Sequence, residues 1–358
     1  MSARVLLTVS GAIPRDLDEQ IAREDRPRPD YHAMAEAMGA DVIDHVAARK
    51  ACGWIGKVLE RVVGINILLA WACFRRRRDY QLIFTDGEQV GLPFAALCRF
   101  LGRRGVRHFM IVHLLTVRKK RHVYRGLHLG PLFDRLFVYA SRQRDLIVDE
   151  LGYPRDRIVL TPFTVDCSFW NPERCTAAPR PVICSAGLEF RDYPILLEAM
   201  TGSEVGVILA AASPWSRRRD NSGDVPPRPN VTVARLGFVE LRQLYADSRI
   251  VVVPLLQCDF QAGITTILEA MAMAKPIVCT RTRGQTDTLV DGLNGRYVPP
   301  SDAGALRHAV DELLQDREAA SNLGSAARAW AVEHADLPVY AKRLADEVDL
   351  ELRYPARQ

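Results

Sequence analysis

Short apolar runs alternate with helix-spaced segments along the first part of the chain. Runs of this kind, ended by Gly, Pro or Asp, are typical of strands buried in a sheet. The predicted strands cover residues 5–10, 41–44, 82–85, 108–112, 135–139 and 158–160. Apolar residues recur with helical spacing at residues 31–38, 54–78, 92–101 and 141–151. Strands that alternate with helices of this length predict a parallel, doubly wound α/β sheet.

A second alternating series follows a segment rich in Pro and Ala at residues 171–180. Its predicted strands cover residues 181–185, 206–211, 250–254 and 277–279, and its predicted helices cover residues 194–200 and 241–246. Residues 215–229 are charged and rich in Pro, which predicts a surface loop. A chain of 358 residues is too long for one ordinary core. We therefore expect two α/β domains, residues 1–170 and 181–337, joined by a linker at 171–180.

Residues 54–78 have two interpretations. As a core helix of the first domain, the segment needs no further role. As an interfacial helix, it would place Trp54 and Trp71 among lipid headgroups and the arginines at 75–78 on phosphates. The pattern alone leaves both interpretations open.

Composition places the chain among ordinary globular proteins, with 48% hydrophobic and 25% charged residues. The eight cysteines include no C-x-x-C pair, so neither a zinc knuckle nor a redox motif is indicated. Residues 5–9 favour a first strand over a signal peptide. The longest apolar run, residues 64–74, is too short to span a bilayer. We therefore expect a cytoplasmic protein with reduced thiols.

Basic residues are concentrated in one part of the chain. Between residues 49 and 128 there are 17 basic and 4 acidic residues, with the densest runs at 75–78 and 118–121. Such an excess can bind an anionic membrane surface or a phosphorylated acceptor. It can also serve solubility alone. Nucleic acid is not expected, because aromatic residues do not interleave with these runs. We expect a peripheral contact of residues 49–128 with the anionic inner face of the plasma membrane.

The stretch from residue 260 to residue 278 carries a candidate phosphate site. Gly263 has no Cβ, so a bulky anion can approach the backbone there. Ile264, Thr265 and Thr266 then open an Ala-rich helix, whose free N–H groups and dipole attract phosphate. Glu269 lies on the same helical face, one turn deeper, where it can accept hydrogen bonds from two ribose hydroxyls. The alternative is a capping box, in which Thr266 and Glu269 only close the start of the helix.

A family resemblance is carried by the sequence LEAMA at residues 268–272 and by RGQTDTLVDGLNGRYVPPSD downstream of it. These segments resemble the donor-site signature of retaining GT-B glycosyltransferases of family four (group 1). Gln261 stands where that family usually has its first Glu. The resemblance implies GT-B architecture, with two Rossmann-like doubly wound domains that face a cleft. It also implies that a C-terminal helix within residues 338–358 crosses back onto the first domain.

The same resemblance implies roles for individual residues. His113 follows a predicted strand, as does the family histidine that contacts the transferred sugar, and Gln261 would bind a sugar hydroxyl. Arg191 stands near the position of a cation that neutralises the diphosphate. The expected catalytic residues are His113 and Gln261, and the expected donor-binding residues are Gly11, Arg191, Gly263, Ile264, Thr265, Thr266 and Glu269. The alternatives are a buried core histidine at position 113 and a surface ion pair between Arg191 and Asp192.

The expected reaction is the transfer of a sugar from a nucleotide donor, such as a UDP- or GDP-sugar, to a hydroxyl acceptor. The acceptor would be a membrane lipid, a lipid-linked glycan or another glycoconjugate. Neither a metal nor a cofactor is expected, because backbone N–H groups at residues 263–266 and the cation of Arg191 can stabilise the charge on the leaving phosphate. The amide of Gln261 cannot act as nucleophile or base, which favours front-face attack with retention. The alternatives are a non-catalytic nucleotide-sugar-binding protein and a GT-B epimerase, for which additional acidic groups are not identified.

Overall fold

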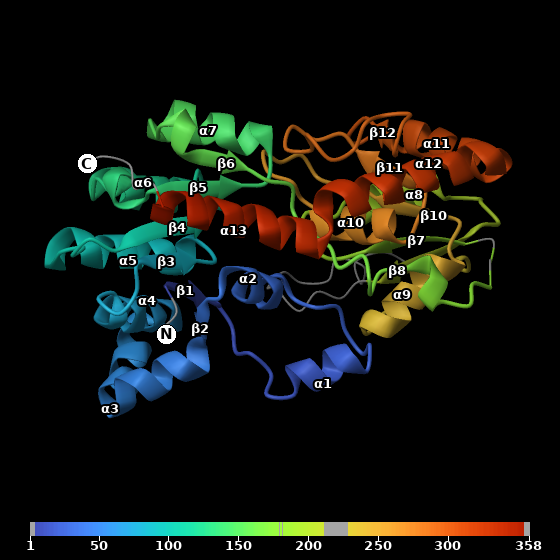
Figure 1. Cartoon of the computed structure of the whole chain (residues 1–358). Coiled ribbons are helices and arrows are strands. Elements are labelled where there is room, and N and C mark those ends of the chain that lie inside the picture. Colours follow the sequence, from blue (N-terminus) through green and yellow to red (C-terminus); the bar gives the residue numbers. More distant parts are fainter. Residues whose placement is uncertain (1–3, 179, 181, 211–227, 354–358) are drawn as a thin grey trace. The chain divides into compact units, whose positions relative to one another are not determined.

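The computed structural model describes residues 4–178, 180, 182–210 and 228–353. The chain divides into two compact units, each built on its own sheet (Figure 1). The first unit contains Met1–Leu17, Pro29–Thr161 and Tyr340–Gln358, and the second contains Asp18–Arg28 and Pro162–Val339. The predicted surface loop at residues 215–229 lies almost entirely outside the described residues.

The first unit contains a six-stranded parallel sheet in the order β2-β1-β3-β4-β5-β6. The strands are β1 (Val5–Thr8), β2 (Asp41–Ile43), β3 (Leu82–Thr85), β4 (Arg107–Ile111), β5 (Arg135–Val138) and β6 (Ile158–Leu160). The chain leaves β1 in one direction to form β2 and returns past it to form β3. The crevice at the carboxyl ends of β1 and β3 is therefore the topological switch point of this sheet.

Helices connect these strands (Figure 1). They are α2 (Asp30–Met38), α3 (His45–Val63), α4 (Ile65–Arg76), α5 (Glu88–Leu101), α6 (Arg118–Gly126) and α7 (Ser141–Leu151). Helix α1 (Leu17–Ala22) also lies between β1 and β2 in the chain, but all of it except Leu17 belongs to the second unit. The last helix, α13 (Leu337–Arg353), packs on the first unit from residue 340 onward. There Tyr340 and Leu344 are buried, and Arg343 Nη1 donates a hydrogen bond of 3.0 Å to Thr161 Oγ1.

The second unit contains a six-stranded parallel sheet in the order β12-β11-β10-β7-β8-β9. Its strands are β7 (Val182–Ala186), β8 (Gly206–Ala210), β9 (Val231–Ala234), β10 (Ile250–Val253), β11 (Ile277–Thr280) and β12 (Arg296–Val298). Its helices are α8 (Tyr193–Ala199), α9 (Phe238–Asp247), α10 (Ile264–Ala272), α11 (Ala303–Gln315) and α12 (Arg317–Trp330). Here the switch point lies between β7 and β10.

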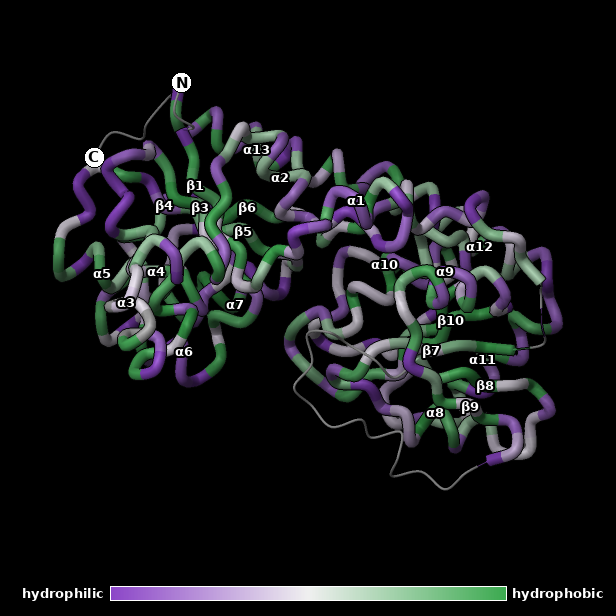
Figure 2. The backbone as a smooth tube through the Cα atoms, turned by 90° about the horizontal axis from the view of Figure 1, so that it is seen from below, coloured by the Kyte–Doolittle hydropathy of each residue, from purple (hydrophilic) through white to green (hydrophobic). Residues whose placement is uncertain are grey.

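The central strands are almost entirely apolar, as expected of parallel strands covered on both faces. All residues of β1, β3, β10 and β11 are buried. Figure 2 shows the strands as largely hydrophobic segments inside each unit, with hydrophilic stretches in the outer helices and loops. The predicted fold class, two parallel doubly wound α/β sheets, is confirmed.

The single helix predicted over residues 54–78 is wrong. The segment is divided between α3 and α4 at Gly64, which has φ 86° and ψ 159°. An apolar pattern cannot reveal such a break, because both helices keep the same spacing on either side of one glycine. A second glycine, Gly53, kinks α3 with φ 59°.

The predicted linker at residues 171–180 lies inside the second unit, because the chain changes unit between Thr161 and Pro162. Its backbone is tied to the end of α9: Ala178 N–H donates to Asp247 Oδ1 at 2.9 Å, and Arg180 N–H donates to Asp247 O at 3.1 Å. The Pro- and Ala-rich composition could not predict these hydrogen bonds, because their acceptor, Asp247, lies far along the chain. Strands β9 and β12 and helices α1, α6, α11 and α12 were also not predicted.

Candidate active site

Two loops meet at the switch point of the second sheet. One loop follows β7 and leads through Arg191 into α8, and the other follows β10 and leads through Gly263 into α10. Arg191 and Leu255 form an isolated antiparallel bridge that joins the two loops. Because ligands of doubly wound sheets bind at this edge, the two loops form the candidate site of the second unit.

Helix α10 begins with an uncapped N-terminus. Its N-cap residue is Gly263, with φ 78° and ψ 4°, and no side chain caps the helix. The first N–H groups of an α-helix lack intrahelical partners, so those of Ile264, Thr265 and Thr266 carry the positive end of the helix dipole. Thr265 is exposed and Thr266 is buried. This helix start can accept an anion such as a phosphate.

Arg191 lies buried beneath this helix start, with 6% of its surface exposed. Its Nε donates to Ala186 O at 2.8 Å, Nη1 donates to Glu189 O at 2.8 Å, and Nη2 donates to Thr266 Oγ1 at 3.0 Å. Burial lowers the pKa of Arg191. A guanidinium still stays protonated, so it places a fixed positive charge against the first turn of α10.

Two glycines make room for this guanidinium. A Cβ on Gly187, whose φ is 90°, would lie 2.6 Å from Arg191 Nη2, and a Cβ on Gly263 would lie 3.1 Å from Arg191 Nη1. The alternative of a surface ion pair with Asp192 is wrong, because Asp192 instead caps α8 by accepting from Ile195 N–H at 3.3 Å. The guanidinium is instead held by three protein oxygens, Ala186 O, Glu189 O and Thr266 Oγ1.

Glu269 lies one turn deeper in α10 and is 8% exposed. Tyr245 of α9 donates its hydroxyl to Glu269 Oε2 at 2.9 Å. Burial raises the pKa of Glu269 to about 8, while the Tyr245 hydrogen bond and the charge of Arg191 act in the opposite direction. The capping-box alternative is wrong, because the N-cap position is Gly263, which has no side chain, and Thr266 is already inside the first turn.

Gln261 lies at the loop before α10, and its side chain is turned toward the loop after β11. Its Nε2 donates to Thr286 O at 2.6 Å, while its buried Oε1 has no partner among the described residues. Gln285 has the same arrangement: its Nε2 donates to Ala262 O, and its buried Oε1 is unpartnered within the described residues. Two amide oxygens in neighbouring loops are thus left to accept hydrogen bonds.

The first unit holds Gly11 and His113 at the carboxyl edge of its own sheet. Asp86, directly after β3, accepts from Thr8 Oγ1 at 2.6 Å and from Ser10 N–H at 2.5 Å, which fixes the loop that leads to Gly11. His113, after β4, is exposed, and its Nε2 lies 2.9 Å from Asp86 O. The alternative of a buried core histidine at position 113 is therefore wrong.

The buried histidine is His108, inside β4. Its ring lies between Phe94 and Phe133, with centroid distances of 4.8 and 4.7 Å, and burial lowers its pKa to about 3. At neutral pH it is an uncharged core residue, whereas His113 faces solvent.

The position of His113 is fixed by a carboxylate that the sequence did not reveal. Glu88 is buried at the start of α5, and its Oε1 accepts from the backbone N–H groups of His113 at 2.8 Å and Leu114 at 2.5 Å. Lys120 Nζ, 3.3 Å from Glu88 Oε2, balances the charge. Asp30 of α2 interacts electrostatically with His113 as well, and burial raises the pKa of Asp30.

The sequence-predicted residues thus form two sets. Within the second unit, Arg191, Gly263 and Thr266 are in direct contact, and Glu269 follows on the same helix. Gly11 and His113 belong to the first unit. Tyr245, Gln285 and Glu88 were missed by sequence reasoning. Gln285 lies in the quoted segment RGQTDTL, but Tyr245 and Glu88 act through contacts that no local pattern shows.

Two further features bear on the sequence expectations. Within the described residues, no group of three or more His, Cys, Asp or Glu side chains is placed to hold a metal ion. In the part of the chain that the structure describes, every helix is too short or too polar to span a bilayer.

Residues 204–316 match the family described as Glycosyl transferases group 1. This match lies within the second unit and covers about a third of the chain. The matched residues run from just before β8 to the end of α11, so they include Tyr245, the α10 start and Glu269.

Two proteins of known name are similar to parts of this chain. A GDP-mannose-dependent alpha-(1-6)-phosphatidylinositol monomannoside mannosyltransferase of Mycolicibacterium smegmatis is 37% identical over 79 residues, 22% of this chain and 21% of that protein. The Escherichia coli K12 protein WcaL, whose name assigns it to colanic acid biosynthesis as a glycosyltransferase, is 24% identical over 257 residues, 61% of each chain. The matches therefore span about a fifth and three fifths of these relatives.

Solved structures share the fold over nearly the whole chain. HepE of Anabaena, solved in complex with UDP and glucose, superposes with a TM-score of 0.68 at 16% identity, covering 97% of this chain and 99% of that chain. At this identity the likeness shows the fold, with two Rossmann-like sheets as in GT-B proteins.

Proposed function

We propose that this protein is a retaining glycosyltransferase that moves a sugar from a nucleoside diphosphate sugar to a hydroxyl acceptor. The observation that carries the proposal is the uncapped start of α10, with a buried guanidinium beneath it and a buried carboxylate one turn deeper. The group 1 domain match over the same residues and the GT-B fold support it.

In this proposal the diphosphate lies on the N–H groups of Ile264, Thr265 and Thr266. The helix dipole and the charge of Arg191 stabilise the negative charge that builds up on the departing phosphate. Glu269 accepts hydrogen bonds from the ribose hydroxyls. The free amide oxygens of Gln261 and Gln285 are the acceptors that hydroxyls of the sugar would use.

The reaction breaks the bond between the sugar C1 and the phosphate oxygen and forms a bond from C1 to the acceptor oxygen. The acceptor's proton passes to the departing phosphate on the same face, which retains the configuration at C1. Gln261 supplies no nucleophile, because an amide cannot form a glycosyl ester. Charge stabilisation by α10 and Arg191 is the basis for proposing that no metal is needed.

His113 has a defined tautomer in this scheme. A carbonyl oxygen can only accept a hydrogen bond, so the contact of 2.9 Å with Asp86 O requires the proton on Nε2. The other ring nitrogen, Nδ1, is then an acceptor for a sugar hydroxyl. We therefore assign His113 to binding of the transferred sugar.

Incubating the full-length protein with a panel of UDP-, GDP-, ADP- and dTDP-sugars and measuring nucleoside diphosphate release tests the proposal. We expect one donor to release its nucleoside diphosphate, and a hydroxyl acceptor to increase that release. The product is expected to keep the anomeric configuration of the donor. Tight donor binding without release would favour a non-catalytic nucleotide-sugar-binding protein. Interconversion of the donor sugar without an acceptor would favour an epimerase.

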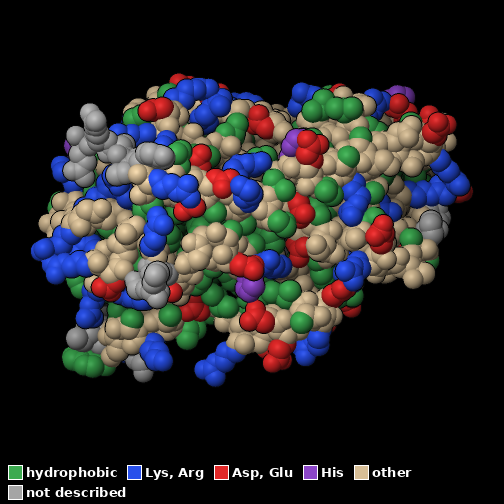
Figure 3. Space-filling model, in the orientation of Figure 1, with side chains coloured by type: hydrophobic (Ala, Val, Ile, Leu, Met, Phe, Trp, Pro, Cys, Tyr) green, Lys and Arg blue, Asp and Glu red, His purple; other side chains and the backbone are tan. Residues whose placement is uncertain are grey.

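The acceptor is proposed to be a membrane lipid or a lipid-linked glycan, reached at the inner face of the plasma membrane. Helix α3 exposes Trp54 (76%), Val58 (55%) and Val62 (77%), which lie on one stripe because they are four residues apart. Figure 3 shows many Lys and Arg side chains over the part of the first unit that holds α5, α6 and α7. An exposed stripe of one tryptophan and two valines, in a unit that also carries the basic helix α6, fits an anionic lipid surface.

Residues 54–78 belong to two helices, α3 and α4, which differ in exposure. Helix α4 is a core helix: Leu68, Leu69 and Phe74 are buried, and Trp71 stacks on Phe74 with a centroid distance of 5.9 Å. Trp71 is therefore not available as a headgroup anchor. The exposed stripe belongs to α3 alone.

For this stripe we expect the variant Trp54→Ser/Val62→Ser to bind anionic vesicles about tenfold more weakly than the wild type. Insertion of the two apolar side chains into the lipid contributes about 1.5 kcal/mol or more to binding. Co-sedimentation with vesicles of phosphatidylglycerol and phosphatidylcholine measures this. The matched control is Val233→Ser/Val239→Ser, which removes two exposed valines from the second unit. Equal binding to purely neutral vesicles would contradict the electrostatic part of the proposal.

A pH dependence follows from Glu269. Because burial raises its pKa to about 8, the folded protein holds a proton that the unfolded chain releases near pH 4.5. The free energy of unfolding therefore falls as pH rises from about 4.5 to about 8, because the folded protein keeps this proton when the unfolded chain has lost it. Donor affinity is expected to rise as pH passes about 8, because the carboxylate of Glu269 is then ionised.

The matching prediction concerns Tyr245→Phe. Removing the hydroxyl that favours the ionised form raises the pKa of Glu269 further, so the midpoint of the rise in donor affinity moves to higher pH. Calorimetric titration of donor against pH measures the midpoint, and Glu269→Gln is expected to abolish the dependence. An unchanged midpoint in Tyr245→Phe would show that the hydroxyl is only a packing contact.

A further inference from the structure

A hollow of about 620 Å³ lies at the edge of the first sheet opposite to Gly11 and His113. It is formed where β3 and β4 begin, by the end of α4, the turn before β4 and the end of α13. Four arginines line it (Arg77, Arg78, Arg104 and Arg107), and the only carboxylate among its described lining residues is Glu351. Nothing in the proposed reaction uses this hollow.

The charge of Arg77 is held in place without a carboxylate. Its side chain is buried, Nη1 donates to Phe74 O at 2.6 Å, and Nε donates to Gly102 O at 3.1 Å. Its guanidinium also lies over the Phe74 ring, 3.6 Å from the centroid. Backbone carbonyls and a ring face orient a cation but do not neutralise it.

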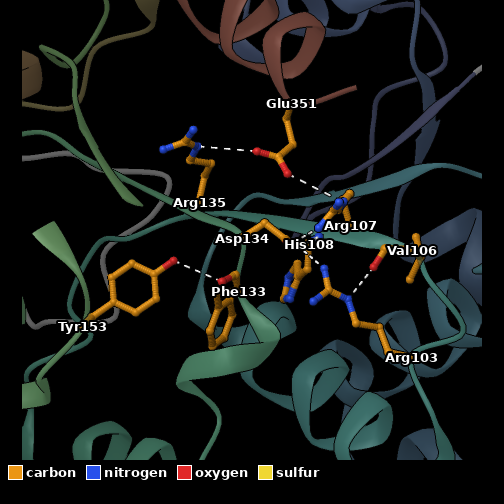
Figure 4. A network of polar contacts seen from close by, with 9 residues as sticks. All are labelled: Arg103, Val106, Arg107, His108, Phe133, Asp134, Arg135, Tyr153 and Glu351. Carbon is orange, nitrogen blue, oxygen red and sulfur yellow. Dashed lines mark hydrogen bonds and ion pairs between the residues drawn. The ribbon is translucent and has the colours of Figure 1, made fainter. Parts of the chain in front are cut away.

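Glu351 does not neutralise Arg77 either, because two other arginines already share it. Its Oε1 is 3.6 Å from Arg107 Nε and its Oε2 is 3.8 Å from Arg135 Nε. Figure 4 shows Glu351 between these two guanidinium groups. Arg107 Nη1 is also 3.1 Å from Asp134 Oδ1. Arg107 is therefore balanced by acids, whereas Arg77, Arg78 and Arg104 are not.

Arg78 and Arg104 are exposed at the rim, and neither has an ion pair within the described residues. The positive charges of both Arg78 and Arg104 act on Arg77 and add to the effect of burial in lowering its pKa. Three cations that face one hollow repel each other, and bound anion charge would relieve that repulsion. Planar guanidinium groups also suit bidentate contacts to phosphate oxygens.

We propose that this hollow binds a phosphate-bearing anion, through Arg77 from below and Arg78 and Arg104 from the rim. Its volume lies within the range of small-molecule pockets and would hold a di- or oligophosphate or a phosphorylated headgroup. The proposal does not rest on the glycosyltransferase function. Within the first unit the hollow lies at the opposite edge of the sheet from His113, so it is a separate binding site.

Titration calorimetry of the full-length protein with inorganic pyrophosphate tests the site. The variant is Arg78→Gln/Arg104→Gln, and the matched control is Arg99→Gln/Arg118→Gln, which removes two exposed arginines of the same unit outside the hollow. Loss of two charge-assisted contacts is expected to weaken one pyrophosphate site at least tenfold, with the control unchanged. Binding at α10 is a second site that both variants retain.

Vesicles identify the source of the phosphate. If the rim variant loses binding to vesicles with phosphatidylinositol phosphate but not to those with phosphatidylglycerol, the ligand is a phosphorylated headgroup. If only the pyrophosphate affinity changes, the ligand is a free phosphate compound. The proposal is overturned if the rim variant and the control bind pyrophosphate and both kinds of vesicle alike. Because neither substitution touches α10 or His113, donor turnover stays at the wild-type level in either case.

Discussion

Replacing Glu269 with alanine is expected to raise the dissociation constant for the donor by roughly 30- to 150-fold while the fold stays intact. Two hydrogen bonds from ribose hydroxyls to a buried carboxylate are together worth about 2–3 kcal/mol. Titration calorimetry with the donor that the panel identifies measures the change. The melting temperature is expected to fall by several degrees, because the variant leaves one buried hydroxyl, that of Tyr245, without its partner, at a cost of about 1–3 kcal/mol.

The control for Glu269 is another helical glutamate of the same unit. Glu240 Oε2 accepts from Gly237 N–H at 2.8 Å and closes the start of α9, so Glu240→Ala is expected to cost about 1 kcal/mol of stability and leave donor affinity unchanged. If Glu240→Ala is as stable as the wild type, while Glu269→Ala binds the donor normally but is unstable, Glu269 stabilises the fold and does not bind the donor. Glu269→Gln keeps the size of the side chain and isolates the effect of its charge.

Replacing Arg191 with methionine is expected to lower both stability and activity. The three oxygens that Arg191 bonds, Ala186 O, Glu189 O and Thr266 Oγ1, lose their donor in a buried place. The expected cost is about 3–5 kcal/mol, a fall in melting temperature on the order of 10 °C. Thermal unfolding followed by circular dichroism measures the stability, and kcat/KM for the donor measures the loss of charge under α10.

Arg191→Lys separates the two roles of this side chain. Lysine keeps the positive charge but cannot direct three donors to three oxygens at once. We expect stability to fall nearly as far as in Arg191→Met, with part of the donor turnover retained. Arg235→Met, at an exposed position, is the control and is expected to change stability by less than about 0.5 kcal/mol. If Arg191→Met has the same melting temperature and the same kcat/KM for the donor as this control, Arg191 has no role in the site.

Much of the fold followed from local pattern. Short apolar runs located β3, β6 and β10 to within a residue, because buried parallel strands must be apolar on both faces. The start of α10 was equally readable: a glycine followed by an Ala-rich helix defines an uncapped N-terminus whatever surrounds it. Elements with weaker apolar signal were missed, among them the basic helix α6 and the half-exposed strand β9.

The sequence by itself determined two parallel doubly wound sheets and the helix start that can bind phosphate, since both depend on periodicity and on single glycines. The tertiary structure alone decided which side chains surround that helix start. Arg191 reaches Thr266 across 75 residues, and Tyr245 reaches Glu269 across 24. It also brought Arg77, Arg104 and Glu351 together at one edge of the first sheet. Such contacts arise when separate elements pack against each other, and the order of residues along one element carries no record of its neighbours.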